Sequence, residues 1–251
     1  MKETNKMYHI NLSKEDLMGA KYAILPGDPF RVNKIAMYLD NAQYLGSSRE
    51  YTAYLGDIKN EKVLVISTGM GGPSTAICIE ELVQIGIENF IRVGTSGGMQ
   101  LEVKAGDVVI ASGAIRAEGT SKEYLPIEYP AIADFYITSA LKKATEVLNF
   151  TSHIGVVHCK DSFYGQHSPE RMPVSYELLN KWDSWIKGGA LCSEMETAAL
   201  YTVCSTLKVK AGAVLLVIWN QEREKAKLDQ EECFDVDRAI KVAIKAIELM
   251  I

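Results

Sequence analysis

The chain alternates short apolar runs with longer segments whose apolar residues recur every three to four positions. The short runs are rich in β-branched residues and predict buried strands at residues 22–25, 63–67, 90–93, 108–111, 153–159 and 213–218. The longer segments predict helices at residues 73–85, 133–148, 194–207 and 236–250. Strands that alternate with helices predict an α/β fold whose largely parallel central sheet carries helices on both faces.

No linker, repeat or low-complexity tract interrupts the 251 residues, so we expect residues 1–251 to form a single domain. A turn around Asn60 predicts a hairpin between residues 51–58 and 63–67. The longest irregular segments are expected at residues 118–130 and 161–173, and loops of that length are often functional.

Composition narrows the class of protein. The net charge of −5 disfavours general nucleic-acid binding, and no window approaches the 18 apolar residues of a membrane span. The five cysteines are scattered without a CxxC pair, so we expect buried, reduced thiols and a cytoplasmic location.

Two predicted strand ends combine glycine with arginine. Arg92 lies within an apolar run that we expect to end in a glycine-rich turn containing Thr95, and Arg31 follows another strand after Gly27. A buried arginine needs a partner, and backbone amides at a strand end can hold an anion. The two corners together predict a phosphate site.

Three further motifs have both a chemical and a plain structural interpretation. Residues 69–73 form a glycine-rich strand–helix junction that suits either an anion or a bare turn. Glu194 and Glu196 flank Met195 and suit a ribose diol, or simply complement a helix dipole. Phe163, Gln166 and Arg171 suit a nucleobase edge, or a polar loop that contacts nothing.

Several common catalytic motifs are absent from the sequence. GxGxxG and GxxxxGK[ST] do not occur, which disfavours dinucleotide-binding and P-loop chemistry. The four histidines lack metal-ligand spacing, and no GxSxG is present, so neither a transition metal nor a serine nucleophile is expected.

Taken together, the motifs resemble the nucleoside phosphorylase-I family, most closely its bacterial uridine phosphorylase branch. They are PGDPFR (26–31), SREY (48–51), STGMGGPS (67–74), IRVGT (91–95), FYGQ (163–166) and SEME (193–196). These motifs span nearly the whole chain in the order of the family. The resemblance implies a three-layer α/β/α sandwich with a mixed sheet. It also implies reversible phosphorolysis of uridine to uracil and ribose 1-phosphate, a step of pyrimidine salvage that requires no cofactor.

The resemblance also implies roles for particular residues. Phosphate would be held by Gly27, Arg31, Arg49, Arg92 and Thr95, with Arg49 coming from a neighbouring subunit. The ribose would be bound by His9, Glu194, Met195 and Glu196, with His9 also reaching across the interface. The base would be read by Phe163, Gln166, Arg171 and Arg223. Arg31, Arg92, Gln166 and Arg171 would carry the catalytic step.

Assembly is a further expectation from the resemblance. The family forms a homohexamer, a trimer of dimers, and a structural potassium ion at the dimer interface would be bound by Glu50, Met70 and Ser74.

Two departures from the family pattern bear on the base. Relatives place Gln and Arg two residues apart, whereas five positions separate Gln166 from Arg171, which leaves Arg223 as a rival. Purine-specific relatives carry Ser-Asp where this chain has Trp219 and Asn220, and without that acid we expect a pyrimidine substrate. The alternatives are a purine nucleoside phosphorylase of the same fold, a hydrolytic nucleosidase and a non-catalytic nucleoside-binding protein.

Overall fold

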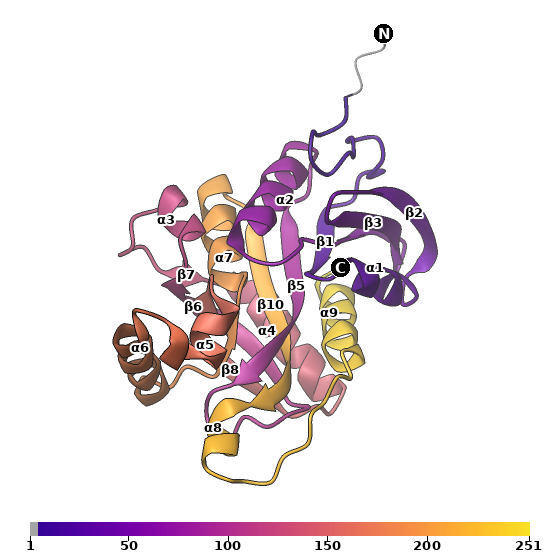
Figure 1. Ribbon diagram of the computed structural model, residues 1–251. Coiled ribbons are helices and arrows are strands. Elements are labelled where there is room, and N and C mark those ends of the chain that lie inside the picture. The colour runs from indigo at the N-terminus through magenta and orange to yellow at the C-terminus, as the bar shows by residue number, and fades with distance from the viewer. Residues whose placement is uncertain (1–4) are drawn as a thin grey trace.

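The computed structural model describes residues 5–251. Within these residues, ten strands pair in one mixed sheet (Figure 1). The strands are β1 (Tyr22–Pro26), β2 (Asp40–Ser48), β3 (Tyr51–Ile58), β4 (Glu61–Ile66), β5 (Asn89–Gly98), β6 (Val108–Ala117), β7 (Ala131–Ile132), β8 (Ser152–Lys160), β9 (Cys192–Glu194) and β10 (Lys210–Asn220).

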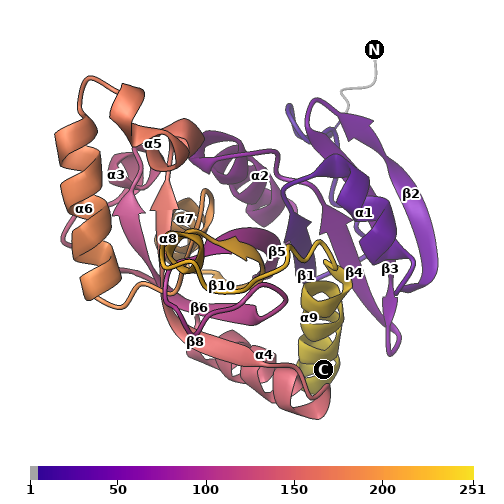
Figure 2. The same cartoon turned by 60° about the horizontal axis from the view of Figure 1, so that its bottom comes forward.

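Helices cover both faces of this sheet, and each face has its own apolar core. One core contains side chains of α2 (Gly72–Gln84) and α7 (Thr197–Leu207), with α3 (Thr120–Tyr124) beside them. The other contains side chains of α1 (Pro29–Ala36), α4 (Phe135–Val147) and α9 (Asp237–Met250). Figure 2 shows α2 and α4 on opposite sides of the sheet. The expected three-layer α/β/α sandwich with a mixed sheet is confirmed.

Five strands pair in a closed circuit. β5 pairs with β10, β10 with β6, β6 with β8, β8 with β9, and β9 returns to β5. β5 is long enough to join this circuit to the rest of the sheet, because its first half pairs with β1 and its last residues pair with β9. The three-residue strand β9 therefore closes the ring beside the end of β5.

Local sequence explains several boundaries. The hairpin of β3 and β4 is confirmed, and Lys59 and Asn60 adopt the positive φ values that its tight turn requires. α1 begins at Pro29 after Asp28, whose side chain accepts a hydrogen bond from the Phe30 amide.

Some boundaries differ from the prediction. Residues 94–98 were expected as a turn, but they continue β5 because they pair with β10 and β9. The helix expected from residue 194 begins at Thr197, because Cys192–Glu194 pair as β9. The segments expected to be irregular contain α3, α5 (Phe163–His167) and the 3₁₀ turn Pro169–Arg171. α6 (Ser175–Lys187) and α8 (Gln221–Lys225) complete the helices.

The expected state of the cysteines is confirmed, since all five are free thiols and only Cys233 is not fully buried. Among the helices of residues 5–251, none has the length and apolar character needed to cross a membrane.

Candidate active site

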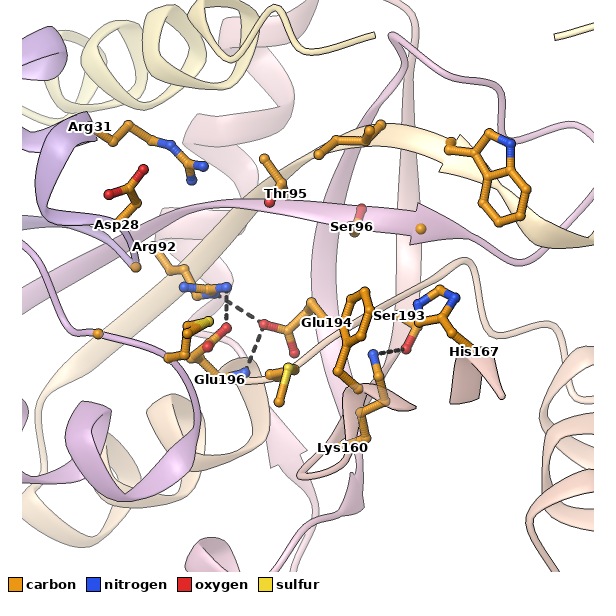
Figure 3. Close-up of a pocket in the computed structure, with 18 of the residues that line it drawn as sticks. Asp28, Arg31, Arg92, Thr95, Ser96, Lys160, His167, Ser193, Glu194 and Glu196 are labelled. Atoms are coloured by element: carbon orange, nitrogen blue, oxygen red, sulfur yellow. Dashed lines mark hydrogen bonds and ion pairs between the residues drawn. The ribbon is translucent and has the colours of Figure 1, made fainter. Parts of the chain in front are cut away.

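A cavity of about 730 Å³ opens beside β5, α1 and the β9–α7 junction. It collects most of the motifs singled out in the sequence. Figure 3 shows Arg31, Arg92 and Glu196 at one end, Glu194 between, and Lys160 with His167 at the other end. Residues from seven separate parts of the chain thus share one pocket.

Arg92 is the most buried cation of the cavity, with 5% of its surface exposed. Its Nε donates to Glu194 Oε2 at 3.1 Å, and its Nη2 donates to Glu196 Oε2. Nη1 is buried and has no hydrogen-bond partner in residues 5–251. Burial would lower the pKa of Arg92, but the Glu196 and Glu194 carboxylates outweigh it and raise the pKa. Arg92 therefore stays charged and keeps one nitrogen for an anion.

Glu194 and Glu196 are held at the start of α7. Glu194 Oε2 accepts hydrogen bonds from the amides of Glu196 at 3.0 Å and Thr197 at 3.1 Å, in the manner of a helix cap. Glu196 Oε1 accepts from the Gly71 amide at 2.6 Å. Burial raises the pKa of Glu196, and the charge of Arg92 opposes the rise. Glu194 thus accepts hydrogen bonds from the first amides of α7, and both glutamates line the cavity, while their contact with a ribose stays a prediction.

The other expected phosphate residues of this chain also line the cavity. Gly27, Arg31 and Thr95 line it together with Arg92. A Cβ atom on Gly27 would lie 3.2 Å from the Gly69 carbonyl oxygen and 3.9 Å from Arg92 Nη1, so glycine keeps this corner open. Burial and the nearby charge of Arg92 lower the pKa of Arg31. Two crowded guanidinium groups favour a bound anion.

Arg49 and His9 lie together, outside the residues that line this cavity. Ser48 Oγ donates to the His9 carbonyl at 2.7 Å, and the Arg49 guanidinium lies 5.9 Å from the ring centre of Tyr8. His9 Nδ1 contacts Glu81 Oε1 at 2.5 Å. The two residues expected to act in a neighbouring subunit thus share one surface, and their roles stay predictions.

The expected cation residues surround Gly69. Glu50 and Met70 line the cavity, and Ser74 Oγ donates to the Met70 carbonyl at 3.2 Å. A Cβ atom on Gly69 would lie 2.8 Å from Glu50 Cγ and 3.2 Å from Ser74 Oγ. Carboxylate, carbonyl and hydroxyl oxygens therefore lie close together there.

The expected base residues are only partly brought together. Phe163 lines the cavity and lies against His167, with 4.3 Å between ring centres. Gln166 instead lines a second cavity of about 700 Å³. The two cavities are adjacent, because Lys160, His167 and Trp219 line both of them. The side chain of Gln166 accepts from Ser193 Oγ at 2.7 Å and donates to Gln221 at 3.2 Å.

The two candidate arginines lie outside both cavities. The Arg171 guanidinium lies 5.1 Å from the ring centre of Tyr164. Arg223 donates to the carbonyls of Leu101 at 2.8 Å and Asp229 at 2.7 Å. Their contact with a base stays a prediction.

Trp219 and Asn220 follow the end of the apolar run of β10. Trp219 lines both cavities, whereas the Asn220 side chain is fully buried. Asn220 Nδ2 donates to the carbonyls of Gln100 and Val103, each at 2.8 Å, and Oδ1 caps α8. Asn220 is therefore a structural residue whose polar atoms are all occupied.

Sequence reasoning missed Lys160, the last residue of β8. This lysine is 7% exposed and lines both cavities. Its Nζ donates to Ser193 Oγ at 2.8 Å. A lysine directly after an apolar strand was the signal that could have revealed it.

Comparison of the sequence with known proteins identifies the family of this chain. The family model of the phosphorylase superfamily matches residues 21–251, and the chain belongs to that superfamily. It is 52% identical to the uridine phosphorylase of Treponema pallidum, over 99% of this chain and 95% of the relative. It is 38% identical to the uridine phosphorylase of Escherichia coli, over 96% of each chain. It is also 33% identical to the guanosine phosphorylase of Halorubrum lacusprofundi, over 96% of this chain and 98% of the relative.

Proposed function

We propose that this protein is a uridine phosphorylase, a pentosyltransferase that converts uridine and phosphate reversibly to uracil and ribose 1-phosphate. The observation that carries the proposal is Nη1 of buried Arg92, which has no hydrogen-bond partner among residues 5–251 and lies beside Gly27 and next to the Glu194–Glu196 segment. An anion donor and two carboxylates for a diol in one pocket suit phosphate under a ribose. The names of the relatives at 52% and 38% identity support the same activity.

The mechanism follows from where charge develops. As the glycosidic bond stretches, positive charge grows on C1′ and the ring oxygen of the sugar. Phosphate held by Arg31, Arg92, Thr95 and the open corner at Gly27 stabilises that charge and then bonds to C1′. Glu194, Met195 and Glu196 orient the ribose. The catalysis is positioning and electrostatic stabilisation, with no covalent enzyme intermediate.

The preference for a pyrimidine rests on Asn220. A purine leaving group needs an acid that protonates its ring, whereas the Asn220 side chain is buried and fully hydrogen-bonded. Trp219 fills the wall of the cavity beside it.

Assembly forms part of the proposal. His9 and Arg49 lie on one surface outside the cavity, which suits contribution to the site of a neighbouring subunit. We therefore expect a homodimer as the minimal active unit and a hexamer as a trimer of dimers. The free thiols suit a reducing cytoplasm and a role in pyrimidine salvage.

A structural potassium ion at the dimer interface is a further part of the proposal. Glu50, Met70 and Ser74 supply oxygen atoms, which hard cations prefer. The ion would be structural, and catalysis would not require it.

One assay tests the function. The purified protein is incubated with uridine, thymidine, inosine and adenosine, each with and without phosphate, and free base is measured. Phosphate-dependent release of uracil is the expected result. Release without phosphate would indicate a nucleosidase, release of purines a purine phosphorylase, and binding without release a nucleoside-binding protein.

A further inference from the structure

Lys160 lies at the end of the cavity opposite to Arg31 (Figure 3). Among the described residues that line this cavity, the lysine and arginine side chains are Lys160, Arg31 and Arg92. The two arginines lie at the phosphate end. Lys160 is therefore the cation at the end where the base would lie, beside the exposed ring of Phe163.

The hydrogen bonds of Lys160 leave it able to bind a ligand. An ammonium group has three donors, and one of them is directed to Ser193 Oγ at 2.8 Å. Ser193 Oγ also contacts His158 Nδ1 at 2.9 Å and donates to Gln166. Burial, with a smaller effect from Lys160, lowers the pKa of His158 to about 3, so this histidine is neutral at physiological pH. The network orients the ammonium group and does not neutralise it.

The three polar side chains expected to read the base already contact other parts of the protein. Arg223 donates to two backbone carbonyls, and Arg171 lies against Tyr164. The amide of Gln166 is bonded at both its oxygen and its nitrogen. A leaving pyrimidine takes up negative charge on its carbonyl oxygens. A cation that is largely shielded from water is well suited to stabilise that charge.

We propose that Lys160 is the catalytic cation for the base: its ammonium donates to a pyrimidine carbonyl oxygen and stabilises the charge that develops when the glycosidic bond breaks. The C1′–N1 electron pair passes to the ring, a phosphate oxygen forms the new bond to C1′, and Lys160 keeps its proton. The uracil anion takes a proton from solvent on release. This inference rests on the proposed function.

Burial lowers the pKa of Lys160, and the Glu194 carboxylate opposes that shift. Glu194 thus helps to keep the ammonium charged while it also binds Arg92. The two ends of the cavity share this carboxylate.

The kinetic test compares Lys160→Met and Lys160→Gln with wild type. We expect kcat/KM for uridine to fall about 100-fold, as on removal of one oxyanion donor, with the KM for phosphate nearly unchanged. The loss should be smaller for 5-fluorouridine, because its base is a better leaving group. Lys181→Met is the matched control, since Lys181 is exposed, pairs with Glu177 and lies on the wall of the second cavity. Equal losses for both nucleosides would indicate a structural role and overturn the proposal.

A binding test does not depend on turnover. Calorimetry compares uracil with 5-nitrouracil, which is far more acidic and is largely anionic near neutral pH. Wild type should prefer the anion, and both Lys160 variants should reduce that preference at least tenfold while their thermal unfolding midpoints stay near that of wild type. An unchanged preference would overturn the inference, as would wild type that binds neither base. If wild type binds both bases but uridine is not cleaved with phosphate, the proposed function fails while the role of Lys160 in binding the anion is still decided.

Discussion

Arg92 and Glu196 form a buried ion pair in which each partner also bonds elsewhere: Arg92 to Glu194, and Glu196 to the Gly71 amide. Arg92 therefore has a structural task as well as the anion-binding task that we propose.

Replacing Arg92 with alanine should abolish phosphorolysis and also destabilise the fold. Two buried carboxylates would lose their cation, and breaking such a network costs about 3–5 kcal/mol of unfolding free energy. Urea unfolding and a phosphorolysis assay measure the two effects. Adding Glu194→Gln and Glu196→Gln to Arg92→Ala should recover part of the stability without the activity. Near-normal turnover of the single variant would refute the phosphate role.

Gly27→Ala should weaken phosphate binding selectively. The added methyl group would lie 3.2 Å from the Gly69 carbonyl oxygen, in the corner beside Arg92 Nη1. We expect the KM for phosphate to rise about tenfold, equivalent to about 1.4 kcal/mol, with a smaller change for uridine. Gly119→Ala is the control, because its Cβ would make an ordinary 3.6 Å contact outside the cavity. A rise confined to the KM for uridine would contradict the assignment of this corner.

Asn220→Asp should not create a purine phosphorylase. The new carboxylate would face the Gln100 and Val103 carbonyls in place of an amide donor. Two lost hydrogen bonds in a fully buried place predict a loss of about 2–4 kcal/mol in unfolding free energy. Chemical unfolding and an inosine assay check this, with the exposed Asn149→Asp as control. Rapid inosine cleavage would show that residue 220 can reach the base.

His158 predicts a pH dependence of stability. Its pKa is about 3 in the folded protein because of burial, and it returns to its ordinary value of 6.5 on unfolding. The unfolded chain then binds a proton more readily between these values, so stability is present above pH 6.5 and is lost as pH falls toward 3. This histidine alone should remove about 2 kcal/mol between pH 7 and pH 5. Unfolding curves at both pH values should show a smaller difference for His158→Gln, and an identical difference would contradict the prediction.

A complementation experiment tests whether residues of two subunits together form one active site. Arg49→Ala and Arg92→Ala should each be inactive alone if both guanidinium groups grip one phosphate. If Arg49 acts in the neighbouring subunit, a mixed dimer holds one site with both arginines, and random mixing should restore about a quarter of wild-type activity. Co-expression with two affinity tags isolates the mixed species. No recovery would place both arginines in the same chain's site.

Much of the fold could be predicted from the sequence because several central strands contain buried apolar runs. β5 and β10 have such runs, and their alternation with helices implies layers on both faces. The short strand β9 could not be predicted, since its three residues are held only by neighbours distant in sequence. The expected helix start failed for the same reason.

Four of the residues expected to bind phosphate line the cavity, whereas Phe163 alone of those expected to read the base does so. Arg31 follows an apolar strand and Arg92 lies within one, so the hydrophobic pattern predicted their positions in the fold. Lys160 was missed because a lone lysine at a strand end is usually solvated, whereas this one is buried and lies near Ser193 of β9 and the Phe163 ring of α5. The orientation of Arg171 depends on a tertiary contact with Tyr164 that no local pattern encodes.

β9, which closes the ring of strands, also contacts residues at both ends of the cavity. Ser193 contacts Lys160, and the next residue, Glu194, contacts Arg92, so a single peptide bond joins the end of the cavity that we propose for the base to the end that we propose for phosphate. Under the proposed function, the spacing of these two residues would have to match the length of the sugar. Lengthening this link by one residue would uncouple the two halves of the reaction, even if every side chain named above were retained.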